Sequence, residues 1–159
     1  MSRAIASPDN RSTKGSSIAE FGPALLILFI FLFFPLLDLL TMPMHYMSCA
    51  TLNDLQLREA VNVKKSEAES SSGAVKSQIP HDWQTLGVGQ FVGVVTTPDT
   101  DVKYIDGEGE DKIVIVTTSI TCRPFLTLPW FFPIPGLTVP STYSITSRRI
   151  LENQHNFDS

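Results

Sequence analysis

The stretch Phe21-Gly-Pro-Ala-Leu-Leu-Ile-Leu-Phe-Ile-Phe-Leu-Phe-Phe-Pro-Leu-Leu37 decides how this chain is organised, because it carries no charge over 17 residues. A helix that crosses the hydrocarbon core of a bilayer needs about 20 apolar residues, and the run reaches that length if it continues through Leu39 and Leu40. This continuation requires the Asp38 carboxylate to reach a headgroup layer or a polar partner. We therefore predict a transmembrane helix over residues 16–42.

The flanks of the apolar stretch predict its orientation. Residues 1–15 contain three basic residues and one acidic residue among small polar ones, so we expect a leader peptide without stable structure. Basic residues before a span and no such cluster after it place the leader in the cytoplasm and residues 45–159 outside, as in a single-pass inner-membrane protein. A cleaved secretory signal is the alternative, but residues 38–45 contain no small-residue cleavage site.

The charge of the remaining chain argues against nucleic-acid binding. Residues 16–159 carry nine basic and fifteen acidic residues, a net charge of −6. Phosphate binding draws on clustered Lys and Arg, and the pairs Lys64-Lys65 and Arg148-Arg149 are too short to form such a patch. We expect no nucleic-acid partner.

The rest of the chain divides into a helical and a β-rich region. Residues 43–80 are predicted to form an amphipathic helical region, with a helix from His45 to Glu69 that continues the membrane helix through a bend at Pro43. Residues 81–159 are predicted to form an extracytoplasmic β-rich domain. Its expected strands are Phe91–Thr97, Val102–Ile105, Lys112–Arg123 and Thr142–Ile150. The expected fold class is α+β: an N-terminal transmembrane helix continuing into an amphipathic helix, packed on a small antiparallel β-sheet.

The two cysteines, Cys49 and Cys122, fall on the predicted outer side of the membrane. Alternation in Lys112–Arg123 places one apolar set on the inward face of that strand: Val114, Val116, Ile120 and Cys122. A helix carrying Cys49 would pack on this face, and a cysteine pair in an oxidising compartment predicts a disulfide. Two buried free thiols are the alternative.

No set of residues with catalytic or metal-binding spacing is apparent. His45, His81 and His155 lie in unrelated regions, and no nucleophile-elbow pattern is present. His45 and Cys49 share a helix face, but two ligands do not make a zinc site. The acidic turn Asp106–Asp111 could offer carboxylates to calcium, yet it lacks a spaced ligand series and is better interpreted as a solvated hairpin tip. We expect no enzyme activity, metal or cofactor.

Residues 124–140 contain five prolines, which exclude a helix or a central strand. Between them lie large apolar residues, including Trp130, Phe131 and Phe132. This predicts an extended apolar loop that either covers the small sheet or presents a partner surface.

Glu20 is the only charge at the entrance of the apolar stretch. An acidic side chain at the bilayer centre costs about 2.5–3.5 kcal/mol on insertion scales, and less near the interface. Glu20 therefore either lies among the headgroups or has a function. The segment Gly15-Ser16-Ser17-Ile18-Ala19-Glu20-Phe21 resembles the processing motif of type IV prepilins, in the form found in Flp-type pilins and TadE-like pseudopilins.

That resemblance implies cleavage after Gly15 by a membrane prepilin peptidase. The new amine of Ser16 could then pair with Glu20 of a neighbouring subunit inside an apolar bundle and set the register of assembly. The β-rich C-terminal region is similar to that of TadE-like proteins, whereas Flp-type major pilins are little more than the helix. The prolines Pro23 and Pro35 depart from the expected helix pattern.

The resemblance implies a minor pilin or pseudopilin that primes, caps or regulates a tight-adherence pilus. Its implied partners are the prepilin peptidase, other pilin subunits and an inner-membrane assembly platform. An uncleaved signal-anchored envelope protein with a partner-binding outer domain is the alternative function. A secreted enzyme is the third possibility, and it has no supporting residue set.

Overall fold

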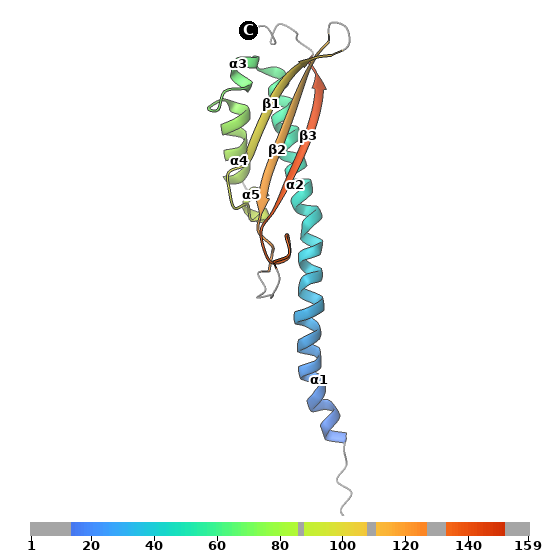
Figure 1. Cartoon of the computed structure of the whole chain (residues 1–159). Coiled ribbons are helices and arrows are strands. Elements are labelled where there is room, and N and C mark those ends of the chain that lie inside the picture. Colours follow the sequence, from blue (N-terminus) through green and yellow to red (C-terminus); the bar gives the residue numbers. More distant parts are fainter. Residues whose placement is uncertain (1–13, 86–87, 108–110, 127–132, 152–159) are drawn as a thin grey trace, which may run out of the picture. The chain divides into compact units, whose positions relative to one another are not determined.

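The computed structural model describes residues 14–85, 88–107, 111–126 and 133–151, with side chains from Phe21 onward. The chain divides into two compact units, Met1–Pro35 and Leu36–Ser159. Figure 1 gives the order of helices and strands along the chain.

The first unit is helical wherever it is described. Helix α1 (Lys14–Leu28) contains Pro23 and is followed directly by a π-helical turn, η1 (Phe29–Phe33). Proline has no amide hydrogen and crowds the carbonyl four residues before it, so a helix changes its bonding nearby. The π turn lies just before Pro35, where the amide of Phe34 donates to the carbonyl of Phe29. Thus Pro23 and Pro35 are accommodated within helical structure.

The second unit combines a long helix with a three-stranded sheet. Helix α2 (Phe34–Asn62) runs through Pro43, which confirms the predicted helical continuity at that proline. The sheet has the order β1-β2-β3, and both pairings are antiparallel. Its strands are β1 (Asp99–Asp106), β2 (Lys112–Cys122) and β3 (Ser141–Ile150). A helix on an antiparallel sheet confirms the α+β class.

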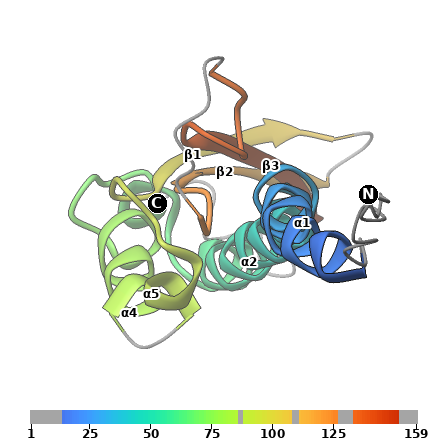
Figure 2. The same cartoon turned by 90° about the horizontal axis from the view of Figure 1, so that it is seen from below.

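The helices of the second unit lie on one face of the sheet, as Figure 2 shows for α2, α4 and α5. The shorter elements are α3 (Lys65–Ala68), η2 (Ala74–Gln78), α4 (Ile79–Thr85) and α5 (Val88–Val92). Burial alternates along β2, with its even-numbered residues from Val114 to Cys122 buried. The predicted inward face of this strand is therefore confirmed.

Two apolar clusters form the core between the helices and the sheet. The first contains Leu57, Ala60, Val61, Ala68, Val75, Val102, Val114, Val116 and Leu151. The second lies toward the end of β2 and contains Cys49, Leu52, Trp83, Val92, Ile120 and Cys122. Both clusters draw on α2 and on the sheet, so the second half of α2 is the central element of this unit.

The predicted strand Phe91–Thr97 is wrong. Residues Val88–Val92 form α5, and only Val94 joins the sheet, through a single antiparallel bridge to Cys122. Gly93 has a φ of 67°, a left-handed conformation that commonly ends helices and favours glycine. The β-branched residues here suggested a strand, but Val92 is buried in the second cluster from a helix instead.

The other predicted elements are found with shifted ends. Val102–Ile105 lies within the longer β1, and the predicted strands beginning at Lys112 and Thr142 correspond to β2 and β3. The predicted helix to Glu69 is interrupted, because Lys64 is extended between α2 and α3. The described parts of residues 124–140 form neither helix nor continuous strand, as their prolines predicted.

Candidate functional site

The N-terminal helix has an exposed apolar surface, which is the first candidate for a functional feature. From Phe21 to Phe33 the large side chains are exposed, for example Phe21 at 65%, Phe31 at 61% and Leu32 at 61%. The helical stretch Phe21–Asn62 contains a most apolar segment of 18 residues, and only 6% of that segment is buried. A core helix of a soluble protein would be mostly buried. This helix is long and apolar enough to span a membrane.

The predicted processing residues lie at the start of α1. The helix begins at Lys14, so the bond between Gly15 and Ser16 falls in its first turn, and Glu20 lies within the same helix. Phe21 is exposed. The amides of a first helical turn have no intrahelical partners, so this turn opens more readily than the turns after it.

Asp38 is the one acidic residue inside the apolar run, and it is fully buried. Its Oδ1 accepts a hydrogen bond of 2.8 Å from the amide of Leu126, in the loop that follows β2. Its Oδ2 has no hydrogen-bond partner among the described residues. The carboxylate thus ties the proline-rich loop to α2, which supplies the polar partner that the sequence required at this position.

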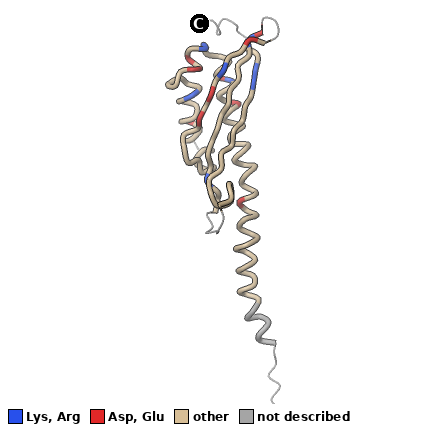
Figure 3. The backbone as a smooth tube through the Cα atoms, viewed as in Figure 1, with Lys and Arg blue, Asp and Glu red and all other residues tan. Residues whose placement is uncertain are grey.

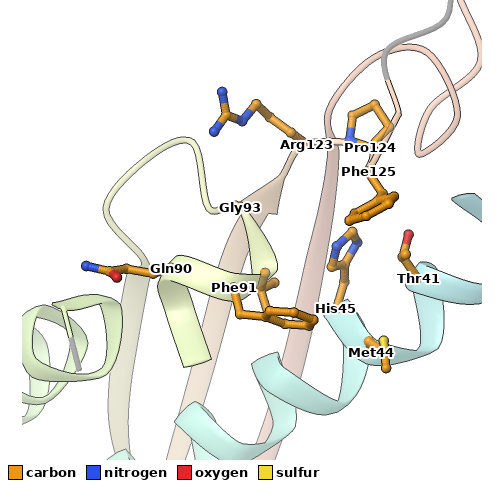
Figure 4. Close-up of a pocket in the computed structure, with 10 residues that line it drawn as sticks. Thr41, Met44, His45, Gln90, Phe91, Gly93, Arg123, Pro124 and Phe125 are labelled. Carbon is orange, nitrogen blue, oxygen red and sulfur yellow. The ribbon is translucent and has the colours of Figure 1, made fainter. Parts of the chain in front are cut away.

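One turn further along α2, a cavity of about 510 Å³ opens between three segments of the second unit. Figure 4 shows the side chains that line it. They are Thr41, Met44 and His45 of α2, Gln90, Phe91, Val92 and Gly93 around α5, and Arg123, Pro124 and Phe125 after β2. Phe91 and Phe125 lie on either side of His45, and both are strongly exposed, at 77% and 66%. The cavity is therefore an open apolar hollow with one cation, Arg123, at its edge.

His45 is the buried titratable group of this cavity. Its ring packs edge-on against Tyr143, with 5.7 Å between ring centroids. Burial lowers the pKa of His45, and the charge of Asp38 opposes this change. The imidazole is therefore neutral near pH 7 and behaves as a packed core side chain.

A buried polar network joins α2 to the sheet and was not predicted. Asn53 donates to the carbonyls of Val116 at 2.9 Å and Ile145 at 3.2 Å, on β2 and β3. Gln56 donates to Thr100 on β1 at 2.7 Å and accepts from Thr118 on β2 at 2.6 Å. These bonds can form together only when α2 lies at one position along its axis relative to the sheet. The network therefore fixes the register of α2 against all three strands.

The two cysteines are free thiols in the structure, so the predicted disulfide is not formed in it. Both are buried in the second cluster. The Cys49 thiol lies 3.5 Å from the carbonyl oxygen of Thr118 and 3.6 Å from that of Tyr143, the partner of Ile120. Cys122 is two residues beyond Ile120, about 7 Å along the strand. Burial raises the pKa of each thiol to about 11, and their joining in an oxidising compartment stays a prediction.

The remaining candidate ligands do not converge. Among the described residues, no group of three or more His, Cys, Asp or Glu side chains could hold a metal ion. His81 is exposed beside Asp82, and Asp106 of the acidic turn pairs with Lys112. His155, residues 108–110 of that turn and the predicted partner surface Trp130, Phe131 and Phe132 lie outside the described part of the chain.

Comparisons with protein-family models, with curated proteins and with solved structures found no match. The resemblance to prepilins rests on the motif Gly15–Phe21 and on the order of helix and β-rich domain.

Proposed function

We propose that this chain is a non-enzymatic minor pilin or pseudopilin of a tight-adherence type IV pilus, processed after Gly15. The observation that carries the proposal is the spacing of Gly15 and Glu20-Phe21 at the entrance of a helix whose described side chains are apolar and exposed. An exposed apolar helix needs lipid or other helices as its surroundings, and both are available to a pilin before and after assembly.

The parts of the chain have separate roles in this proposal. The basic leader remains in the cytoplasm and presents Gly15 to the prepilin peptidase. Cleavage gives Ser16 a free amine, and Glu20 pairs with such an amine on a neighbouring subunit. Because a lone carboxylate in an apolar bundle is costly, this pairing selects one register between helices. The outer α+β domain then determines what the pilus or its assembly platform contacts.

The outer domain has a surface suited to this role. The face of the sheet opposite the helices carries hydroxyl pairs between β2 and β3. They are Thr117–Thr146, Ser119–Ser144 and Thr121–Thr142, with oxygen separations of 2.9, 3.0 and 3.0 Å. A regular hydroxyl surface binds partners through hydrogen bonds rather than through an apolar patch.

Intact mass tests the processing step. The chain is expressed with and without a prepilin peptidase, and we expect loss of residues 1–15 only when the peptidase is present. Gly15→Val is the control, because a branched side chain at the cleaved position should block the reaction while leaving the span unchanged. A full-length chain in the presence of an active peptidase would contradict the proposal and favour an uncleaved signal-anchored envelope protein.

Incorporation into filaments tests Glu20. Glu20→Ala should leave cleavage intact and strongly reduce the amount of the protein in sheared pili. Glu67→Ala, which removes an exposed carboxylate from α3 of the outer domain, is the matched control and should incorporate normally. Equal incorporation of the two variants would exclude the registry role.

A further inference from the structure

Three segments that are distant in sequence and free of Asp, Glu, Lys and Arg meet at one end of the second unit. They are residues 39–53 of α2, residues 83–98 around α5, and residues 124–147 after β2; of these, residues 86–87 and 127–132 are not described. The cavity lined by His45, Phe91 and Phe125 is where they meet. In Figure 3 most charged positions of this unit lie toward the β1–β2 turn, away from this end.

Several exposed apolar side chains gather at this end, and we call them, with the neighbouring cation, the basal face: Met44, Phe91, Arg123, Phe125 and Ile134. Their exposed fractions are 54% for Met44, 77% for Phe91, 66% for Phe125 and 43% for Ile134. Arg123 is also exposed, and no described carboxylate forms an ion pair with it. Large apolar groups around a lone cation are the composition of a membrane-interface surface.

The depth of the basal face follows from counting along the apolar run. A span of about 20 residues that begins at Phe21 ends near Leu40. The headgroup region beyond it is about 5–7 Å thick on each side, which corresponds to about three to five helical residues at 1.5 Å each. Residues 41–45 therefore fall at headgroup level.

The loop after β2 is held at this same level by two contacts with α2. The Leu126 amide donates to Asp38, which lies inside the apolar run. Gly136 approaches Met42 so closely that a Cβ on this glycine would clash with the Met42 Cε. Phe125 and Ile134 are next to these contacts in the chain, so they share the depth of Asp38 and Met42.

We propose that the basal face rests in the outer headgroup layer of the phospholipid bilayer. Phe91, Phe125 and Ile134 enter the boundary between headgroups and acyl chains, and Arg123 contacts lipid phosphate. Asp38 positions the loop for this contact. The inference rests on the proposed membrane anchoring, and it assigns a lipid contact to the outer domain in addition to the helix.

Site-directed spin labelling of the full chain in phospholipid vesicles, at no more than one chain per vesicle, tests this contact. Nitroxides are placed by Phe91→Cys and Phe125→Cys, and the native thiols are 0% and 1% exposed, so the unmodified chain should take up no label. Leu28→Cys reports the anchor, and Ile105→Cys is the matched control, since Ile105 is 44% exposed at the far end of β1. The measurement is the ratio of collision with oxygen, which is enriched in lipid, to collision with an aqueous nickel chelate.

We expect this ratio at positions 91 and 125 to exceed that at position 105 several-fold, and to be highest at position 28. If position 28 is in lipid while positions 91 and 125 match position 105, the lipid contact is excluded and the anchoring stands. If position 28 is also aqueous, the anchoring itself fails. The measurement is repeated in vesicles that each hold many chains. If positions 91 and 125 are aqueous at one chain per vesicle and become shielded only in these crowded vesicles, a neighbouring copy covers the basal face and the lipid contact is excluded.

A second variant tests the contribution of the two phenylalanines. With the label at Ile134→Cys, the pair Phe91→Ser and Phe125→Ser should lower the oxygen-to-nickel ratio several-fold. Both phenylalanines are exposed, so their replacement removes little of the folded core. An unchanged ratio would show that they do not hold this face in the lipid.

Discussion

The apolar helix before Pro35 and the second half of α2 follow opposite rules of burial. From Phe21 to Phe33, large apolar side chains are exposed. From Asn53 to Gln56, two polar side chains are buried and hydrogen-bonded to all three strands. Each arrangement costs free energy unless it is compensated. Exposed apolar side chains need apolar surroundings, and buried polar side chains need hydrogen-bond partners. The comparison shows that one region exposes its apolar side chains, whereas the other is built as a protein core with bonded polar groups.

The two rules meet at Asp38. This carboxylate belongs to the apolar run by sequence, but it is buried and bonded to the amide of Leu126 as a core polar group would be. The transition between the two regions therefore falls within the first turns of α2. Before this transition a charged substitution should be costly, and after it the loss of a buried polar group should be costly.

The largest effect is expected for new charges on the apolar helix. Leu28→Arg combined with Leu32→Arg should cost about 5–7 kcal/mol of insertion free energy, because each arginine near the middle of a span costs about 2.5–3.5 kcal/mol. The chain should then be extracted from membranes by alkaline carbonate. Leu55→Arg is the matched control, since Leu55 is a 43% exposed leucine on the second half of α2. If all variants stay in the membrane fraction, the two regions do not differ in the way proposed.

A smaller but substantial loss is expected when the polar network is broken. Gln56→Leu keeps most of the side-chain volume but leaves the Thr118 hydroxyl hydrogen without its acceptor and the carbonyl of Val75 without its donor, at a cost of about 2–4 kcal/mol. Hydrogen exchange of the β2 amides in detergent-solubilised full chain measures this loss. Gln90→Leu, at an exposed glutamine, should have little effect.

The same network provides a sharper test through its second partner. Adding Thr118→Val to Gln56→Leu should cost less than the sum of the single changes, because the two groups bond to each other. Asn53 keeps two backbone carbonyls as acceptors in this double variant. Strict additivity would show that Gln56 and Thr118 contribute independently.

These residues also show how far the sequence could predict the fold. Alternation of apolar residues located β2 and its inward face, because an antiparallel strand with one buried face has a strict period of two. The same reasoning failed for residues 91–97, where β-branched residues belong to a helix end and a single bridge. Asn53 and Gln56 were not recognised as core residues, and their partners lie on strands 44 to 92 residues away in the sequence. The spacing of Asn53, Gln56 and Ala60 on one helix face was the available signal.

The candidate site was predicted unevenly for a related reason. The apolar run is local in sequence, and the long exposed helix predicted from it is found. The motif Gly15–Phe21 is also local, and its processing stays a prediction. The basal face combines α2, α5 and the loop after β2, and its assembly depends on contacts such as Leu126 with Asp38. A surface built from three distant segments has no local pattern.

The buried thiols predict a dependence of stability on pH. Burial raises the pKa of Cys49 from 9.0 to about 11, so between these values the folded state holds a proton that the unfolded state has lost. Stability from this thiol is therefore complete below pH 9 and falls as pH rises toward 11, by about 1.4 kcal/mol per pH unit for one thiol. Cys49→Ala should reduce the slope by this amount when the free energy of unfolding is measured by urea titration of the detergent-solubilised full chain at each pH. A slope that is equal in both proteins would exclude the thiol as its source.

The smallest effect is expected on the uncovered face of the sheet, at the residue next to the network. Thr117 and Thr118 are neighbours in β2, but Thr117 bonds Thr146 on the uncovered face, whereas Thr118 is fully buried and bonds Gln56. Thr117→Val should change the free energy of unfolding by less than about 0.5 kcal/mol, because water replaces the lost bond and valine suits a strand. Thr118→Val should cost more, roughly 1–3 kcal/mol, because it leaves a buried amide oxygen without a donor. Both variants replace threonine by valine in the same strand, so the change in strand propensity is the same. The difference between their losses of unfolding free energy therefore measures how much burial adds to the value of a hydroxyl hydrogen bond. Equal losses would mean that the uncovered face is covered by another part of the chain or by a partner.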